Sequence, residues 1–150
     1  MIKNMDQFGY PGLEVKGITI HNTGRRESAR ELFNELKNSQ VNQGCHFLID
    51  ETETIQMLPL DWCAYHTGKG KDWGNNHTIA IEICRSQNTS DLYFASQVRA
   101  IRKIKKLMNE YNLTTSDIYF HNDFSPRTYC PHKILETYGN KKNFIKGVNL

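Results

Sequence analysis

The segment 78–84, which reads Thr-Ile-Ala-Ile-Glu-Ile-Cys, is the most strongly apolar run in the chain. Its β-branched residues favour a strand. Side chains alternate across a strand, so the three isoleucines share one face, and Ala80, Glu82 and Cys84 share the other. Both faces are apolar apart from Glu82, which predicts a central strand that other elements cover on both sides.

The rest of the chain alternates strand-like runs with amphipathic helical patterns. We predict strands at 17–21, 44–50, 52–57 and 118–121, and helices at 27–38, 90–112 and 131–138, with a further helical turn at 143–148. The second and third strands form a hairpin through Asp50-Glu51. This pattern predicts a single α/β domain over residues 1–150, with a central mixed β-sheet flanked by α-helices.

Smaller features complete this picture. Tyr10-Pro-Gly12 predicts a turn, and Gly24 ends the turn after the first strand. Ser90 or Asp91 caps the long helix. Its inner stripe is predicted to be Phe94, Val98, Ile101, Ile104, Met108 and Tyr111. Residues 58–77 carry Pro, Trp and Gly without periodicity, so we expect an irregular binding loop there.

Composition excludes several classes of protein. With 38% apolar and 23% charged residues in 150 positions, the chain suits one soluble globular domain. A net charge of +3 is too small to indicate nucleic-acid binding. We find no signal peptide and no membrane-spanning run, which predicts synthesis in a cytoplasm. The four cysteines form no disulfide pattern, so we expect them unpaired.

Two residues near the C-terminus suggest a metal site. His121 ends a predicted strand, and Cys130 follows nine residues later, before a predicted helix. His21, at the end of the strand 17–21, can supply a third ligand. Three protein ligands that leave one position for water are typical of catalytic zinc, so the hypothesis is a zinc site at one edge of the sheet. The alternative is two structural histidines and a buried thiol.

Three further places carry chemistry. Glu82 is costly to bury unless it is paired or used, so it is either a proton carrier or half of a salt bridge to a helix cation. His66 lies between aromatic residues of the long loop and either binds substrate or is an ordinary loop residue. Arg127 and Thr128 precede Cys130 and either donate to an oxyanion or only shape the loop.

Five motifs occur in the order and spacing of a known family. They are Ile20-His-Asn-Thr-Gly24, Gly44-Cys-His-Phe-Leu-Ile49, Ala64-Tyr-His-Thr-Gly68, Ile79-Ala-Ile-Glu-Ile-Cys84, and His121 with Cys130-Pro131. The chain resembles the type 2 zinc amidases, which include phage-lysozyme-type amidases, phage endolysins and peptidoglycan recognition proteins. The resemblance covers residues 15 to 138.

The resemblance implies roles for individual residues. Zn²⁺ would be held by His21, His121 and Cys130, and Glu82 would be the catalytic acid and base. His66 would line the substrate cleft together with Tyr65, Trp62 and Trp73. Relatives carry Tyr where this chain has Cys45 and Lys where it has Thr128, so Thr128, with Arg127 behind it, is the predicted oxyanion donor.

The activity implied is that of an N-acetylmuramoyl-L-alanine amidase that cleaves bacterial peptidoglycan, most like the catalytic domain of an endolysin or prophage lysin. Such a protein is made in the host cytoplasm and acts on the cell wall after release; a monomer is favoured, and no nucleic acid or membrane insertion is expected. The alternatives are a peptidoglycan recognition module that binds without cutting and, from another class, a zinc deaminase. Cys130 argues against the first, and missing His-x-Glu and Cys-x-x-Cys motifs argue against the second.

Overall fold

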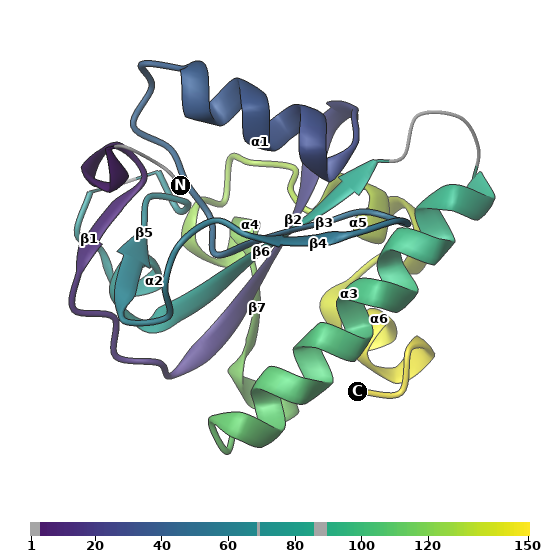
Figure 1. Ribbon diagram of the computed structural model, residues 1–150. Coiled ribbons are helices and arrows are strands. Elements are labelled where there is room, and N and C mark those ends of the chain that lie inside the picture. Colours follow the sequence, from purple (N-terminus) through teal and green to yellow (C-terminus); the bar gives the residue numbers. More distant parts are fainter. Residues whose placement is uncertain (1–3, 69, 86–89) are drawn as a thin grey trace.

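A mixed sheet forms the centre of the computed structural model, which describes residues 4–68, 70–85 and 90–150 (Figure 1). Its strands are β2 (Gly17–Arg26), β3 (Phe47–Ile49), β4 (Thr54–Gln56), β6 (Thr78–Arg85) and β7 (Ile118–Phe120), in the order β4-β3-β6-β2-β7. The β6 strand runs parallel to β2 and β3, and β7 runs parallel to β2, whereas β4 is antiparallel to β3. The predicted α/β fold with a mixed sheet and a central 78–84 strand is confirmed.

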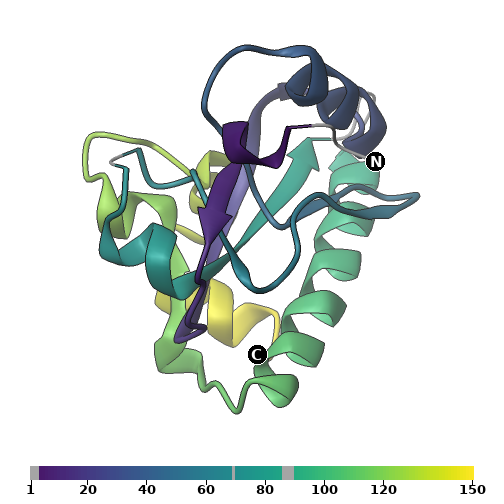
Figure 2. The same cartoon turned by 60° about the vertical axis from the view of Figure 1, so that its left-hand side comes forward.

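Helices cover both faces of this sheet (Figures 1 and 2). On one face α1 (Ala29–Asn38) packs near Ala80 and Cys84. On the other face α3 (Ser90–Glu110), α5 (His132–Tyr138) and α6 (Lys141–Gly147) bury the isoleucines of β6. The predicted division of β6 into two faces is therefore confirmed. The shorter elements are η1 (Met5–Gln7), β1 (Gly9–Pro11), β5 (Trp62–Ala64), α2 (Trp73–His77), η2 (Thr115–Asp117) and α4 (His121–Phe124).

The inner stripe of α3 differs from the predicted one. Phe94 and Val98 are 46% and 47% exposed, whereas Tyr93 and Ala100 are buried. Ile104 lies in the core as predicted, next to Leu107, which the prediction omitted. The first two turns therefore present the neighbouring helical positions to the sheet, because contacts with β6 and β3 rather than local periodicity decide which face is buried. The predicted cap at Ser90 or Asp91 concerns side chains outside the described residues.

Three local predictions are wrong. Residues 58–77 are not wholly irregular, because β5 pairs antiparallel with β1 and α2 begins at Trp73. Tyr10 and Pro11 belong to β1 rather than to a turn. The β2 strand does not end before Gly24 but continues to Arg26, with a register shift against β6 between Asn22 and Arg26. These pairings join segments far apart in sequence, which local patterns do not encode.

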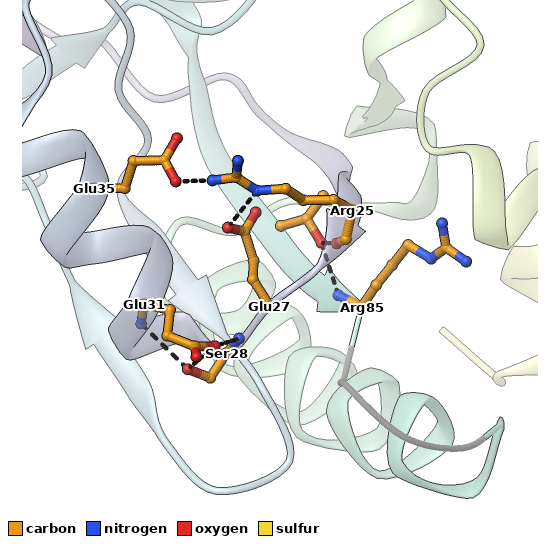
Figure 3. Close-up of polar contacts among 7 residues, drawn as sticks. Arg25, Glu27, Ser28, Glu31, Glu35 and Arg85 are labelled. Carbon is orange, nitrogen blue, oxygen red and sulfur yellow. Dashed lines mark hydrogen bonds and ion pairs between the residues drawn. The ribbon is translucent and has the colours of Figure 1, made fainter.

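Ion pairs and a cap fix the start of α1 (Figure 3). Ser28 is the N-cap, and its side chain and that of Glu31 form a capping box. Just before it, the Arg25 guanidinium pairs with Glu27 at 2.9 Å and also contacts Glu35 of α1. Arg25 thus holds the end of β2 against the helix that follows.

Two buried polar side chains join separate elements. His46 accepts the Ala80 backbone N–H at Nδ1 (2.8 Å) and donates from Nε2 to the Trp62 carbonyl (2.7 Å), so it links β6 to β5. The Asn22 Oδ1 atom accepts the backbone N–H groups of Lys133 and Ile134, both at 3.1 Å. Asn22 therefore caps α5 from a neighbouring strand.

All four cysteines are unpaired, as predicted. Among the described residues no helix combines the length and apolar character that a bilayer crossing needs.

We expect acid to destabilise the fold through His46. Burial lowers the pKa of His46 from 6.5 to about 4. The unfolded chain therefore binds this proton at higher pH than the folded chain. Neutral His46 contributes fully to the free energy of unfolding above pH 6.5, and this contribution is lost as the pH falls towards 4. The free energy of unfolding, measured with urea, should fall between pH 6.5 and 4 by on the order of 3 kcal/mol less in His46→Gln than in the native chain. Parallel profiles for the two proteins would contradict this role.

We expect Asn22→Ala to lower the free energy of unfolding by roughly 1–3 kcal/mol, because two buried N–H groups of α5 lose their acceptor. Asn140→Ala is the matched control, since Asn140 caps α6 from an exposed position through the Asn143 N–H. Its loss should be nearer about 0.5–1 kcal/mol. Equal losses for the two variants would show that the tie between β2 and α5 adds nothing.

Candidate metal centre

His21, His121 and Cys130 converge at one end of the parallel strands. One potential ligand atom from each lies within 4.8 Å of the other two. The Cys130 Sγ atom is 3.8 Å from His21 Nδ1, and the two imidazole ring centroids are 4.6 Å apart. His21 lies on β2, His121 begins α4 directly after β7, and Cys130 stands two residues before α5. The three residues predicted as metal ligands are therefore brought together.

Hydrogen bonds hold the segment that carries Cys130 next to the two histidines. The Asn122 N–H donates to the Cys130 carbonyl at 3.1 Å, which closes the loop between His121 and Cys130. Because Asn22 follows His21 and caps α5, it anchors the segment that carries Cys130 to the strand that carries His21.

The charge states of these side chains suit a cation. Burial lowers the pKa of His21 well below its usual value, with the nearby His121 adding to the effect, and burial also lowers the pKa of His121. Both imidazoles are therefore neutral at pH 7 and carry a free lone pair. Burial, followed by the Glu82 charge, raises the pKa of Cys130 to about 12. A metal ion would reverse this by binding the thiolate, and two imidazoles with one thiolate form a donor set that fits Zn²⁺.

Glu82 lies beside this group. Its Cα is the register partner of His21 across the β2–β6 pair, and both line a cavity of about 190 Å³ with His121 and Cys130. Burial, then the charge of Glu27, raises the pKa of Glu82 to about 8. Within the described chain Glu82 forms no ion pair, so the alternative of a salt bridge to a helix cation finds no support. A carboxyl group in this state can both accept and donate a proton near neutral pH.

His66 contacts one of the potential metal ligands, His21. It is buried, and its Nδ1 lies 3.0 Å from His21 Nε2. The loop that carries it is tied to α2, because Asn75 Oδ1 accepts the backbone N–H groups of His66 and Thr67. His66 also lines a second cavity of about 550 Å³, together with Tyr65, His121 and Asn42.

Of the other residues predicted to act on substrate, only Tyr65 lines one of these two cavities. Tyr65 lines the larger cavity. Trp73 is 43% exposed and packs against Phe124 and Tyr119, and it is not among the residues that line either cavity. Thr128 is half-buried, with its N–H donating to Ser125, and Arg127 is exposed; neither lines the two cavities. Their roles in substrate binding and oxyanion stabilisation remain predictions.

Sequence reasoning missed three residues of this site. Glu27 is buried, lines the smaller cavity and pairs with Arg25. Asn22 and Asn75 position the segments around it. Glu27 was assigned only to a helix, and a polar residue directly after His21 was the one available signal for Asn22. Cys45, expected near the site, lines the cavity as a buried thiol.

Comparisons with known proteins agree on one family. The family model described as N-acetylmuramoyl-L-alanine amidase matches residues 11–133. The chain is 37% identical to the N-acetylmuramoyl-L-alanine amidase XlyB of Bacillus subtilis over 124 residues, which is 82% of this chain and 39% of XlyB. It is 29% identical to endolysin LysK of Staphylococcus phage K, covering 83% of this chain and 27% of LysK.

A solved structure extends this likeness to three dimensions. The structure of PlyL superposes with a TM-score of 0.85 at 29% identity, over 96% of this chain and 89% of PlyL. The chain spans less than half the length of the two curated relatives. Since the family model covers most of its residues, the chain belongs to the N-acetylmuramoyl-L-alanine amidase family.

Proposed function

We propose that residues 1–150 form one catalytic domain that hydrolyses the amide bond between N-acetylmuramic acid and L-alanine of peptidoglycan, with Zn²⁺ on His21, His121 and Cys130. The observation that carries this proposal is the position of Glu82 in the same cavity as the three potential ligands. Membership of the amidase family supports the reaction, and the name of LysK supports a phage or prophage endolysin.

The bound ion would lower the pKa of a water ligand and polarise the amide carbonyl. The work of the chain itself is to move protons and hold the substrate. Glu82 accepts a proton from the attacking water and returns it to the alanine nitrogen as the amide bond breaks. Thr128 is proposed to donate to the carbonyl oxygen as negative charge develops there.

The larger cavity suits the polymer. It opens beside the three potential ligands, and Gln43, His66 and His121 line both cavities. We assign it to the glycan and stem peptide, with Tyr65 and His66 on its wall. The domain would be made in a bacterial cytoplasm and act on the wall after release.

We expect the zinc-loaded protein to release stem peptides from purified peptidoglycan. Mass spectrometry should find a new free N-terminal alanine on them, and Cys130→Ala should abolish both stoichiometric zinc and these products. New reducing sugar ends instead would assign a glycosidase. Muropeptide binding without zinc or cleavage would assign a recognition module.

We expect Glu82→Gln to lower kcat by about 10²–10⁴-fold, because the amide cannot carry the proton, while zinc stoichiometry stays the same. Glu27→Gln is the matched control: the same change in the same cavity, at a carboxylate held by Arg25. Its loss of kcat should be much smaller. Equal losses, or an active Glu82→Gln variant, would remove Glu82 from the mechanism.

A further inference from the structure

A chain of buried polar groups runs from His21 through His66 to Thr78, which lines neither cavity. His21 Nε2 lies 3.0 Å from His66 Nδ1, and His66 Nε2 lies 3.4 Å from the Thr78 hydroxyl. That hydroxyl is 2.8 Å from the Gly74 carbonyl and 2.7 Å from the Thr19 hydroxyl. Thr19 and Thr78 are fully buried, so solvent cannot satisfy their hydroxyl groups.

We propose that Gly74, Thr78 and His66 form a hydrogen-bond relay that fixes the tautomer of His21 and leaves its Nδ1 lone pair facing Cys130. His66 is then a positioning residue for the metal ligand, beyond any contact it makes with substrate. This inference rests on the proposed function, since it concerns the ion that His21 is proposed to bind.

The direction of the relay follows from counting hydrogens at Thr78. A hydroxyl donates one hydrogen and accepts two. Thr19 has no hydroxyl contact in the described structure other than Thr78, so its hydrogen is satisfied only if it donates to Thr78. The hydrogen of Thr78 then goes to the Gly74 carbonyl, which can only accept. Thr78 therefore has a lone pair, and no hydrogen, left for His66.

The histidine tautomers follow in turn. His66 must carry its hydrogen on Nε2 to donate to Thr78, so its Nδ1 is an acceptor. His21 Nε2 must then be the donor in the contact at 3.0 Å. A neutral imidazole has one hydrogen, so His21 Nδ1 is left bare, and this is the atom 3.8 Å from Cys130 Sγ.

The scaffold around His66 is built to hold this geometry. Asn75 Oδ1 accepts the backbone N–H of His66 at 2.9 Å, and the Asp72 carboxylate accepts both the Asn75 N–H and the Thr67 hydroxyl. Gly74 and Thr78 lie in and directly after the same short helix, α2. One element therefore supplies both the carbonyl that starts the relay and the loop anchor that seats its middle member.

Removal of a group that hydrogen-bonds to the second ring nitrogen of a metal-binding histidine commonly lowers metal affinity by about 10–100-fold. We expect this effect at Thr78 as well as at His66. Thr78 lines neither cavity, so its substitution alters no contact with substrate or with a metal ligand. A change in zinc affinity at this position would reach His21 through the hydrogen bonds of Thr78, which go to His66 and to Thr19.

Two pairs of variants test the relay by competition of the protein with a fluorescent zinc chelator. His66→Ala and Thr78→Val should each raise the zinc Kd by about 10–100-fold. His66→Asn should recover most of the affinity, because its Oδ1 replaces the Nδ1 acceptor, and Thr78→Ser should do the same with its hydroxyl. Gln43→Ala is the control. Gln43 lines both cavities but has no hydrogen bond to His21 in the described structure, so this variant should bind zinc like the native chain.

Unchanged zinc affinity in His66→Ala and Thr78→Val would overturn the proposal, as would an Asn variant no better than Ala. A second measurement needs neither zinc nor a variant. Long-range ¹H–¹⁵N NMR of the zinc-free native protein should find the hydrogen of both His21 and His66 on Nε2, and a hydrogen on Nδ1 of either residue would overturn the relay. Should the native protein bind no zinc, the proposed function fails, while this spectrum still decides the relay.

Discussion

The parallel pairing of β2 with β6 is the interaction on which the site depends. It aligns the Cα atoms of His21 and Glu82 as register partners, and alternation sends both side chains to the same face of the sheet. A shift by one residue would turn one of them into the isoleucine core on the opposite face. The hydrophobic pattern that buries Ile79, Ile81 and Ile83 therefore also determines which carboxylate stands next to the three potential ligands.

The parallel pairing of β2 with β7 brings a second potential ligand, His121, next to His21. Ile20 pairs with Phe120, so the residues that follow, His21 and His121, lie side by side where β7 ends and β2 continues. Cys130 then needs its own restraint, because it comes from a loop. Two contacts provide it: Asn122 holds the Cys130 carbonyl, and Asn22 holds the start of α5. Hydrogen bonds thus join each segment that carries a potential ligand to a segment that carries another.

Burial gives these groups their chemical character. It lowers the pKa of His21 and His66 and raises those of Glu82 and Cys130, so without a cation the whole cluster favours its neutral forms. A buried cluster of neutral donors and acceptors is costly unless each group has a partner. The contacts among His21, His66, Thr78 and Gly74 meet that requirement on one side. On the other side, the potential ligand atoms of His21, His121 and Cys130 lie within 4.8 Å of one another.

Much of this protein could be read from local patterns. Period-two alternation identified β6 and its two faces, helical spacing identified α1 and α3, and Pro131 and Gly139 marked the ends of α5. The placement of His21, His121 and Cys130 next to strands or a helix start indicated a shared site. These features depend on residues a few positions apart, and such spacing is written directly in the sequence. The pairing of β1 with β5, the face that α3 buries, the tie from Asn22 to α5 and the contact between His21 and His66 depend instead on residues tens of positions apart. Only the tertiary structure decides them, because which distant groups meet is set by the packing of whole elements and by the need of each buried polar group for a partner.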